Sequence, residues 1–158
     1  MTFCNRHDKI VLGMKKIVLS ALVFMMASTA TVFAGDQISE SELPQRARSL
    51  ISSCFAGDPV SSIEKDNRMR GTEYEVELAS GMELDFNDNG TWRKISAAPG
   101  QTLADNFIPE KIAAYLAKTY PGESVTKILK NRRGYEVELT NNHDLHFDSS
   151  ERFVRVDR

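Results

Sequence analysis

Tyr74-Glu75-Val76-Glu77-Leu78 occurs a second time, unchanged, as Tyr135-Glu136-Val137-Glu138-Leu139, 61 positions further along the chain. In each copy, apolar and acidic side chains alternate strictly, and successive side chains of an extended strand point to opposite faces. The pattern therefore predicts a half-buried β-strand whose tyrosine, valine and leucine face a core while its glutamates face solvent. Because the flanking sequence also recurs, we interpret the chain as a tandem repeat.

A helix is predicted ahead of each copy of this strand. Both helices begin at an apolar residue followed by proline, Leu43-Pro44 and Ile108-Pro109, and proline is tolerated in the first helical turn because its missing N–H needs no partner there. Apolar residues then recur at helical spacing and form a single stripe. The stripe positions after these starts are Ala47, Leu50, Ile51, Cys54 and Phe55 in the first helix and Ile112, Tyr115, Leu116, Thr119 and Tyr120 in the second.

Three further strands complete each repeat. Residues 60–65 match 125–130, and the Leu84 and Trp92 regions match those of Leu145 and Phe153. The first copy is four residues longer between the first two strands, and we place this insertion at a hairpin tip, where length changes are tolerated. Asn89-Gly90 predicts a two-residue hairpin turn. The second copy lacks this turn glycine at residues 149–152, so we expect a looser hairpin there.

Taken together, these patterns predict an α+β fold. It consists of two tandem repeats, residues 43–96 and 108–156, each with one helix and a four-stranded antiparallel meander.

The N-terminal segment is typical of an export signal. Met14-Lys15-Lys16 supplies positive charge, residues 17–30 are almost entirely apolar or small, and Val32-Phe33-Ala34 fits a signal-peptidase site. We therefore expect residues 1–34 to be a signal peptide, with Met14 as the initiator. The apolar run is shorter than the about 20 residues of a membrane span, and no cysteine lies at the cleavage point to carry a lipid. The mature chain, 35–158, is expected to be periplasmic or secreted, with no membrane anchor after cleavage.

The mature chain has an acidic surplus, with 16 Lys and Arg against 21 Asp and Glu. Nucleic acid is not an expected partner, because phosphate binding needs a basic surface. Cys54 is the single cysteine after residue 34, so an intramolecular disulfide is impossible.

The order and duplication of these motifs resemble the PepSY-like family, also described as β-lactamase-inhibitor-protein-like. The resemblance rests on the two proline-initiated helices, the aromatic residues Phe55 and Tyr120 at their ends, the twin glutamate strands, and the motifs Leu84-Asp85-Phe86, Leu145-His146-Phe147 and Gly90-Thr91-Trp92. It implies an exported protein without cofactor or catalytic residues. By analogy with the inhibitor fold, the open face of the sheet would dock a partner protein.

No arrangement of residues predicts catalysis or a cofactor. No serine lies in a glycine-flanked elbow, no glycine loop could cradle phosphate, and the mature chain has only two histidines, His143 and His146. We therefore predict that the protein is not an enzyme.

Two patterns that suggest metal ligands have simpler interpretations. Asp85-x-Asn87-x-Asn89-Gly90 resembles the start of a calcium loop, but position twelve is Ser96 and both flanks are predicted strands, so we interpret it as a hairpin turn. Asp144, His146 and Asp148 share one face of a strand, which we interpret as a solvated polar face. No metal ligand is assigned.

Protein binding is the function that these features favour, inhibitor-like in the sense of the resemblance. The expected interaction residues are Glu75, Glu77, Glu136, Glu138, Trp92 and Phe153. The alternative is a periplasmic protein whose acidic strands bind a small ligand or a cation. The two aromatic residues have two possible placements. They lie among the glutamates if the last strand of each repeat is regular, and in the core if a bulge intervenes.

Overall fold

The computed structural model describes residues 35–69 and 71–157, so the expected signal peptide lies outside the described residues. These residues form an α+β fold with two α-helices, each starting after its proline. The helices are α1 (Gln45–Cys54) and α2 (Glu110–Thr119), preceded by the short 3₁₀ helices η1 (Glu40–Glu42) and η2 (Asp105–Phe107). The strands are β1 (Asp36–Gln37), β2 (Val60–Arg68), β3 (Gly71–Leu78), β4 (Glu83–Asn87), β5 (Trp92–Ser96), β6 (Val125–Asn131), β7 (Gly134–Leu139), β8 (Asp144–Asp148) and β9 (Phe153–Asp157).

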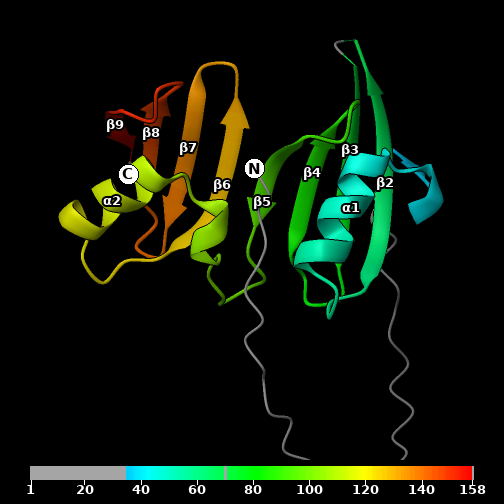
Figure 1. Cartoon of the computed structure of the whole chain (residues 1–158), viewed down its shortest axis with the longest axis horizontal. Helices are drawn as coiled ribbons and strands as arrows, with labels where there is room; N and C mark the ends of the chain where they lie inside the picture. Colours follow the sequence, from blue (N-terminus) through cyan, green and yellow to red (C-terminus); the bar gives the residue numbers. More distant parts are fainter. Residues whose placement is uncertain (1–34, 70, 158) are drawn as a thin grey trace, which may run out of the picture.

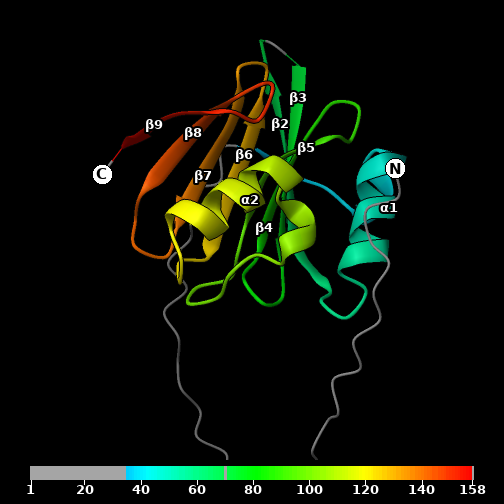
Figure 2. The ribbon, with the colours of Figure 1, turned by 60° about the vertical axis from the view of Figure 1, so that its left-hand side comes forward.

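All nine strands belong to one antiparallel sheet, in which they follow one another in sequence order from β1 to β9. Both helices pack on the same face of this sheet, α1 over the N-terminal half and α2 over the C-terminal half (Figures 1 and 2). The core lies between the sheet and the helices, where Ile51 and Ile112 meet buried strand residues such as Val76 and Val137. Neither helix of the described residues is long and apolar enough to cross a membrane.

Pairing of β5 with β6 joins the two halves into one sheet. Ile95 lies opposite Ile128 in this pair, and both side chains are completely buried. On the helix side, the segment between β5 and α2 adds a second connection, because the ring of Phe107 stacks on that of Phe55 at the end of α1, with centroids 5.4 Å apart. The two expected meanders are therefore parts of one continuous sheet with one core.

The extra residues of the N-terminal half lengthen strands rather than a loop, which corrects the expectation of a longer hairpin tip. β2 and β3 have 9 and 8 residues, whereas β6 and β7 have 7 and 6. The pairing reaches Arg68 and Gly71 in the first hairpin and Asn131 and Gly134 in the second, so the added residues are paired strand residues. The β2–β3 hairpin consequently extends beyond the other strands (Figure 1).

The β4–β5 turn contains three residues, not the two that Asn89-Gly90 predicts. Asn87 N–H donates to Thr91 O at 3.0 Å, and Gly90 N–H donates to Asn87 O at 2.9 Å. Gly90 has φ +75°, and a Cβ there would lie 2.9 Å from the backbone nitrogen of Ala47 in α1. Glycine is therefore needed both for the left-handed conformation and for close packing of the turn on the helix.

The β8–β9 turn has the same geometry without a glycine, so the expectation of a looser hairpin is wrong. Glu151 takes the left-handed conformation, with φ +64°. The Asp148 carboxylate accepts hydrogen bonds from Ser150 N–H at 2.9 Å and Arg152 N–H at 3.0 Å, and it also pairs with the Arg152 guanidinium. Backbone and side-chain bonds from Arg152 lower the pKa of Asp148, as expected for a carboxylate held in its charged form.

A bulge in the last strand of each half decides the placement of Trp92 and Phe153. Phe86 pairs with Trp92 and Leu84 with Ile95, and the register shift between these pairs turns Trp92 to the helix side together with Ile95. The corresponding shift in β8–β9 turns Phe153 to the helix side, where its ring stacks on Tyr115 at 4.8 Å. Placement among the glutamates is therefore wrong for both aromatic residues, although Phe153 keeps 37% of its surface exposed.

We expect Gly90→Ala to destabilise the protein by at least about 2 kcal/mol, because it combines left-handed strain with a clash against α1. Gly100→Ala is the matched control, since Gly100 has φ +74° but a Cβ there would meet no atom within 4 Å. Glu151→Gly should be neutral or stabilising by up to about 1 kcal/mol, because it relieves strain. Urea unfolding measures the stability of all three variants. An equal loss of stability at Gly90 and Gly100 would show that the close packing of Gly90 on α1 contributes nothing.

Candidate functional site

The face of the sheet that carries no helix, here called the open face, is covered by polar side chains. Strand register aligns them in two rows across the sheet. One row runs through Ser62, Glu77, Glu83, Ser96, Lys127, Glu138, Asp144 and Asp157, and the other through Gln37, Glu64, Glu75, Asp85, Lys94, Leu129, Glu136, His146 and Arg155. The repeated glutamates therefore stand in both rows, in both halves of the molecule.

Lys94 and Asp85 form the centre of the N-terminal half of this face. Lys94 Nζ lies 3.1 Å from Asp85 and 3.2 Å from Glu83, and only 13% of the Asp85 side chain is exposed. Burial raises the pKa of Asp85 to about 6, although the Lys94 charge acts in the opposite direction. Burial lowers the pKa of Lys94, but pairing with Asp85 and Glu83 outweighs this effect and the net shift is upward.

Arg68, at the far end of β2, is the second cation on this half of the open face. Its guanidinium lies 2.7 Å from Asp66, 3.3 Å from Glu73 and 3.7 Å from Glu75. One cation thus serves three carboxylates, and Glu75 is the most distant of them.

Glu64 and Glu77, the remaining carboxylates of this half, have only neutral partners among the described residues. Glu64 accepts a hydrogen bond from Gln37 at 3.2 Å, and Glu77 accepts one from Ser62 at 3.3 Å. Glu64 faces Glu75 directly across the strand pair, so burial and then the Glu75 charge raise the pKa of Glu64. A shallow cavity of about 140 Å³ opens between these groups; its lining residues are Ser62, Glu64, Glu75, Val76, Glu77, Glu83, Asp85 and Lys94.

The N-terminal half of the open face therefore has a large acidic surplus. In the described part of the chain, it presents seven carboxylates (Glu64, Asp66, Glu73, Glu75, Glu77, Glu83 and Asp85) and two cations (Arg68 and Lys94). Like charges on paired strands destabilise a sheet, so this concentration of negative charge lowers the stability of the free protein.

The C-terminal half of the open face is closer to neutral. Lys127 pairs with Glu138, and His146 lies 3.0 Å from Asp157 and 3.8 Å from Glu136. Arg155 also pairs with Asp157. The glutamates of the repeated pentapeptide thus have different surroundings in the two halves, although their sequence is identical.

Of the expected interaction residues, the structure brings Glu75 and Glu77 together beside the cavity. It places Glu136 and Glu138 on the same face but further along the sheet, and it places Trp92 and Phe153 on the opposite side. The sequence interpretation missed Asp85 and Lys94 as the centre of the site. The sequence does contain a signal for Asp85. It alternates with the apolar residues Leu84 and Phe86, so it must share a face with the glutamates of β3.

Neither suggested metal pattern forms a metal-binding cluster in the part of the chain that the structure describes. Asn87 and Asn89 use their side-chain oxygens to accept Thr91 N–H at 2.9 and 3.1 Å, as expected for a hairpin turn. His146 is engaged by its neighbouring carboxylates, and His143 packs against the ring of Tyr120.

The sheet carries both helices on one face and the repeated glutamates on the other, and the family comparison agrees with this duplicated arrangement. The family model described as "Putative beta-lactamase-inhibitor-like, PepSY-like" matches the chain twice, at residues 32–84 and 72–155. The chain belongs to this PepSY-like family, and two matches are consistent with the tandem repetition of the sequence. A comparison with curated proteins gives no match.

Three solved structures similar to this one come from Bacteroides. One, described as "a putative periplasmic protein of unknown function" from Bacteroides vulgatus, is 31% identical with a TM-score of 0.74, covering 78% of this chain and 100% of that one. A "putative calcium-regulated periplasmic protein" from Bacteroides thetaiotaomicron is 26% identical with a TM-score of 0.73, covering 77% and 95%. A third, again from Bacteroides vulgatus, is 24% identical with a TM-score of 0.75, covering 81% and 100%, and shows the fold alone.

Asp85→Asn should change how stability depends on pH. The pKa of Asp85 is about 6 in the folded protein and near 3.8 when unfolded, so the folded state binds this proton more tightly. The stabilisation that the proton gives is therefore complete below pH 4 and is lost as the pH rises through 6. The free energy of unfolding of the wild type, relative to Asp85→Asn, should fall by up to about 3 kcal/mol between pH 4 and 7.

Urea unfolding of the wild type and Asp85→Asn across this pH range measures the difference between their free energies of unfolding. The other titrating groups are present in both proteins, so their effects cancel in this difference. Lys94→Met removes the charge that lowers the pKa of Asp85, so the decline should move to higher pH. Parallel pH profiles for wild type and Asp85→Asn would contradict the assignment.

Proposed function

We propose that the protein is an exported, non-catalytic binding module that uses the N-terminal half of its open face to dock a basic region of another protein. The observation that carries this proposal is the surplus of seven carboxylates over two cations among the described residues on that half of the face. Export is supported by the predicted signal peptide and by the description of the similar structures as periplasmic.

Charge complementarity is the physical basis of this docking. Glu64 and Glu77 have neutral partners, and Glu75 lies 3.7 Å from a guanidinium shared with two other carboxylates. Lysine or arginine side chains of a partner would satisfy these groups and relieve the repulsion between Glu64 and Glu75. Such complementarity accelerates association and selects basic partners more than it raises affinity.

Inhibition of an enzyme is a narrower version of this proposal. Its support is the description of the family as inhibitor-like, which is a statement about fold, and fold alone does not determine function.

The repeated pentapeptide supplies a matched test. Glu75→Gln with Glu77→Gln should weaken partner binding at least about tenfold, whereas Glu136→Gln with Glu138→Gln should leave it nearly unchanged. In the free protein, the first pair should also raise the melting temperature slightly, because it removes repulsion between paired strands.

The mature chain would be immobilised and challenged with periplasmic extract, and a protein retained saturably would be identified and its binding measured at 50 and 300 mM NaCl. Equal loss of binding in both double variants would contradict docking on the N-terminal half. The absence of any saturable partner would contradict the proposed function as a whole.

Cation binding is a second candidate, favoured by the description of one similar structure as calcium-regulated. The N-terminal carboxylates could supply oxygen ligands for calcium. The Lys94 ammonium, however, already occupies the position between Asp85 and Glu83 that a cation would take.

Thermal unfolding with and without 5 mM calcium separates the two candidates. A ligand that binds only the folded state raises the melting temperature, so calcium binding predicts an increase that 5 mM magnesium does not reproduce. If Lys94 fills the position, the wild type should show no increase and Lys94→Met should gain one. An increase in the wild type would favour the cation candidate over the protein partner.

A further inference from the structure

A second cavity lies on the helix side of the sheet, at the junction of the two halves. It has a volume of about 410 Å³, within the range of small-molecule sites, and such sites often lie between structural units. It opens between the β4–β5 turn and the tip of the β6–β7 hairpin; its lining residues are Asn87, Asp88, Asn89, Thr91, Trp92, Arg93, Lys130, Asn131 and Arg132. We call it the junction cleft.

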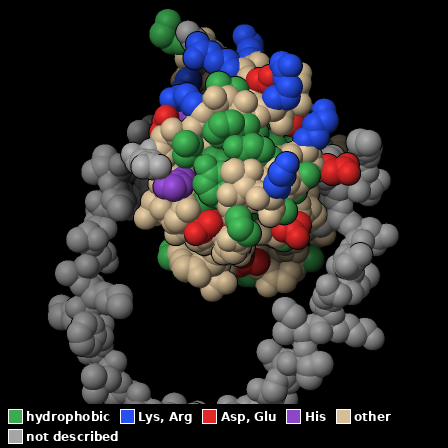
Figure 3. All heavy atoms as spheres, turned by 90° about the vertical axis from the view of Figure 1, so that its left-hand side faces the viewer, with side chains coloured by type: hydrophobic (Ala, Val, Ile, Leu, Met, Phe, Trp, Pro, Cys, Tyr) green, Lys and Arg blue, Asp and Glu red, His purple; other side chains and the backbone are tan. Residues whose placement is uncertain are grey.

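The charge of the junction cleft is positive. Arg93, Lys130 and Arg132 line it, and among the described residues none of the three lies within ion-pair distance of a carboxylate. Asp88 is the one acidic residue among the described residues of the lining, and its carboxylate lies against Gly71 of the neighbouring hairpin. Lysine and arginine side chains gather at this end of the molecule, which carries the hairpin tips (Figure 3).

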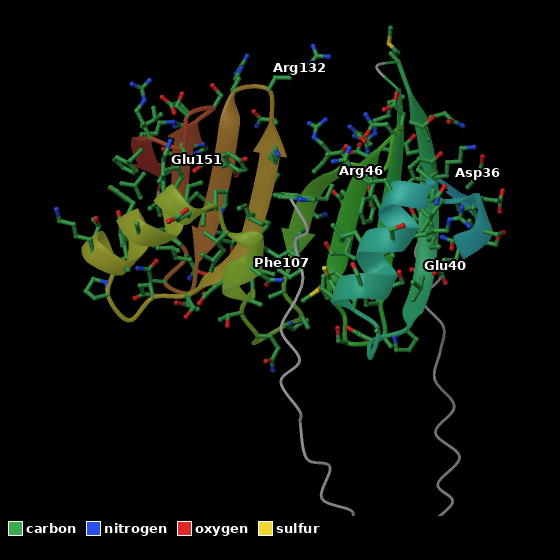
Figure 4. The ribbon with its side chains drawn as sticks, viewed as in Figure 1. Asp36, Glu40, Arg46, Phe107, Arg132 and Glu151 are labelled. Atoms are coloured by element: carbon green, nitrogen blue, oxygen red, sulfur yellow. The ribbon has the colours of Figure 1, made fainter. Side chains whose placement is uncertain are left out.

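Two of the cations are held in place by the fold. Arg93 Nε donates to the Lys130 carbonyl at 2.8 Å, which leaves the two terminal nitrogens of its guanidinium to donate elsewhere. The Lys130 ammonium lies 5.6 Å from the ring centroids of both Trp92 and Tyr135. Arg132 stands at the tip of the opposing hairpin, at the same end of the molecule as Arg46 of α1 (Figure 4).

The three asparagines of the lining use their side-chain oxygens as acceptors within the protein. The side-chain oxygens of Asn87 and Asn89 accept Thr91 N–H, and that of Asn131 accepts Arg133 N–H at 2.7 Å. No hydrogen bond among the described residues uses the amide NH₂ groups of these asparagines, so each side chain can still donate. The cleft thus combines three cations with three amide donors, and guanidinium groups match carboxylate and phosphate oxygens in bidentate geometry.

We propose that the junction cleft binds a small molecule with at least two anionic oxygen groups, carboxylate or phosphate. The three cations and the Asp88 carboxylate leave two positive charges, which two negative charges of a ligand would balance. The half-buried Trp92 ring offers an apolar wall for the body of the ligand. The site is independent of the proposed docking function, because the junction cleft shares no lining residue with the cavity of the open face.

Trp92 is the single tryptophan of the chain, so its fluorescence reports directly on the cleft. The mature protein would be titrated with citrate and with inorganic pyrophosphate at constant ionic strength, and the Trp92 indole N–H would be followed by NMR in parallel. We expect saturable binding with a dissociation constant below about 1 mM for at least one of them. Binding of citrate alone identifies a carboxylate ligand, and binding of pyrophosphate alone identifies a phosphate ligand.

Arg132→Ala should weaken this binding about tenfold, the usual scale for one charge-assisted hydrogen bond. Arg133→Ala is the matched control, since Arg133 occupies the same exposed turn but does not line the cleft. Neither change removes a buried group, so both variants should fold. The proposal is overturned if neither anion gives a saturable signal up to 10 mM by either method, or if both variants weaken binding equally.

Discussion

The pairing of β5 with β6 is the contact on which the rest of the structure depends. It places Ile95 against Ile128 in the centre of the core and makes one sheet from two meanders. Each meander alone has a helix and four strands, which is little material for a stable core. The same pairing aligns the polar rows of both halves into one open face, and it brings the two hairpin turns together around the junction cleft.

Much of the fold follows from local patterns in the sequence. Alternation in the repeated pentapeptide was enough to orient β3 and β7, because one buried face fixes the register of a strand. The stripes after Pro44 and Pro109 likewise defined both helices. The pairing of β5 with β6 could not be derived in this way, since it joins residues more than thirty positions apart and no local pattern specifies which strand edges meet.

The bulges in β5 and β9 limited the prediction of the site. A single additional residue reverses the side to which Trp92 points, and the alternation pattern alone does not show whether that residue is accommodated in the strand or in the turn. Sequence correctly placed the glutamates on one face. It did not distinguish the acidic half from the half that is closer to neutral, because that difference arises from cross-strand neighbours such as Lys127, which pairs with Glu138.

The additional length of the β2–β3 hairpin has a dynamic consequence for the acidic face. Residues 67–68 and 71–72 pair only with each other, because the pairing of β1 with β2 ends at Lys65 and that of β4 with β3 ends at Glu73. A two-stranded ribbon without a third strand is marginally stable, so this segment will open locally more often than the sheet below it. Arg68 lies in the ribbon, and each opening carries its guanidinium away from Glu73 and Glu75. The negative potential that an approaching molecule meets is therefore not constant, because it changes each time the β2–β3 hairpin opens and closes.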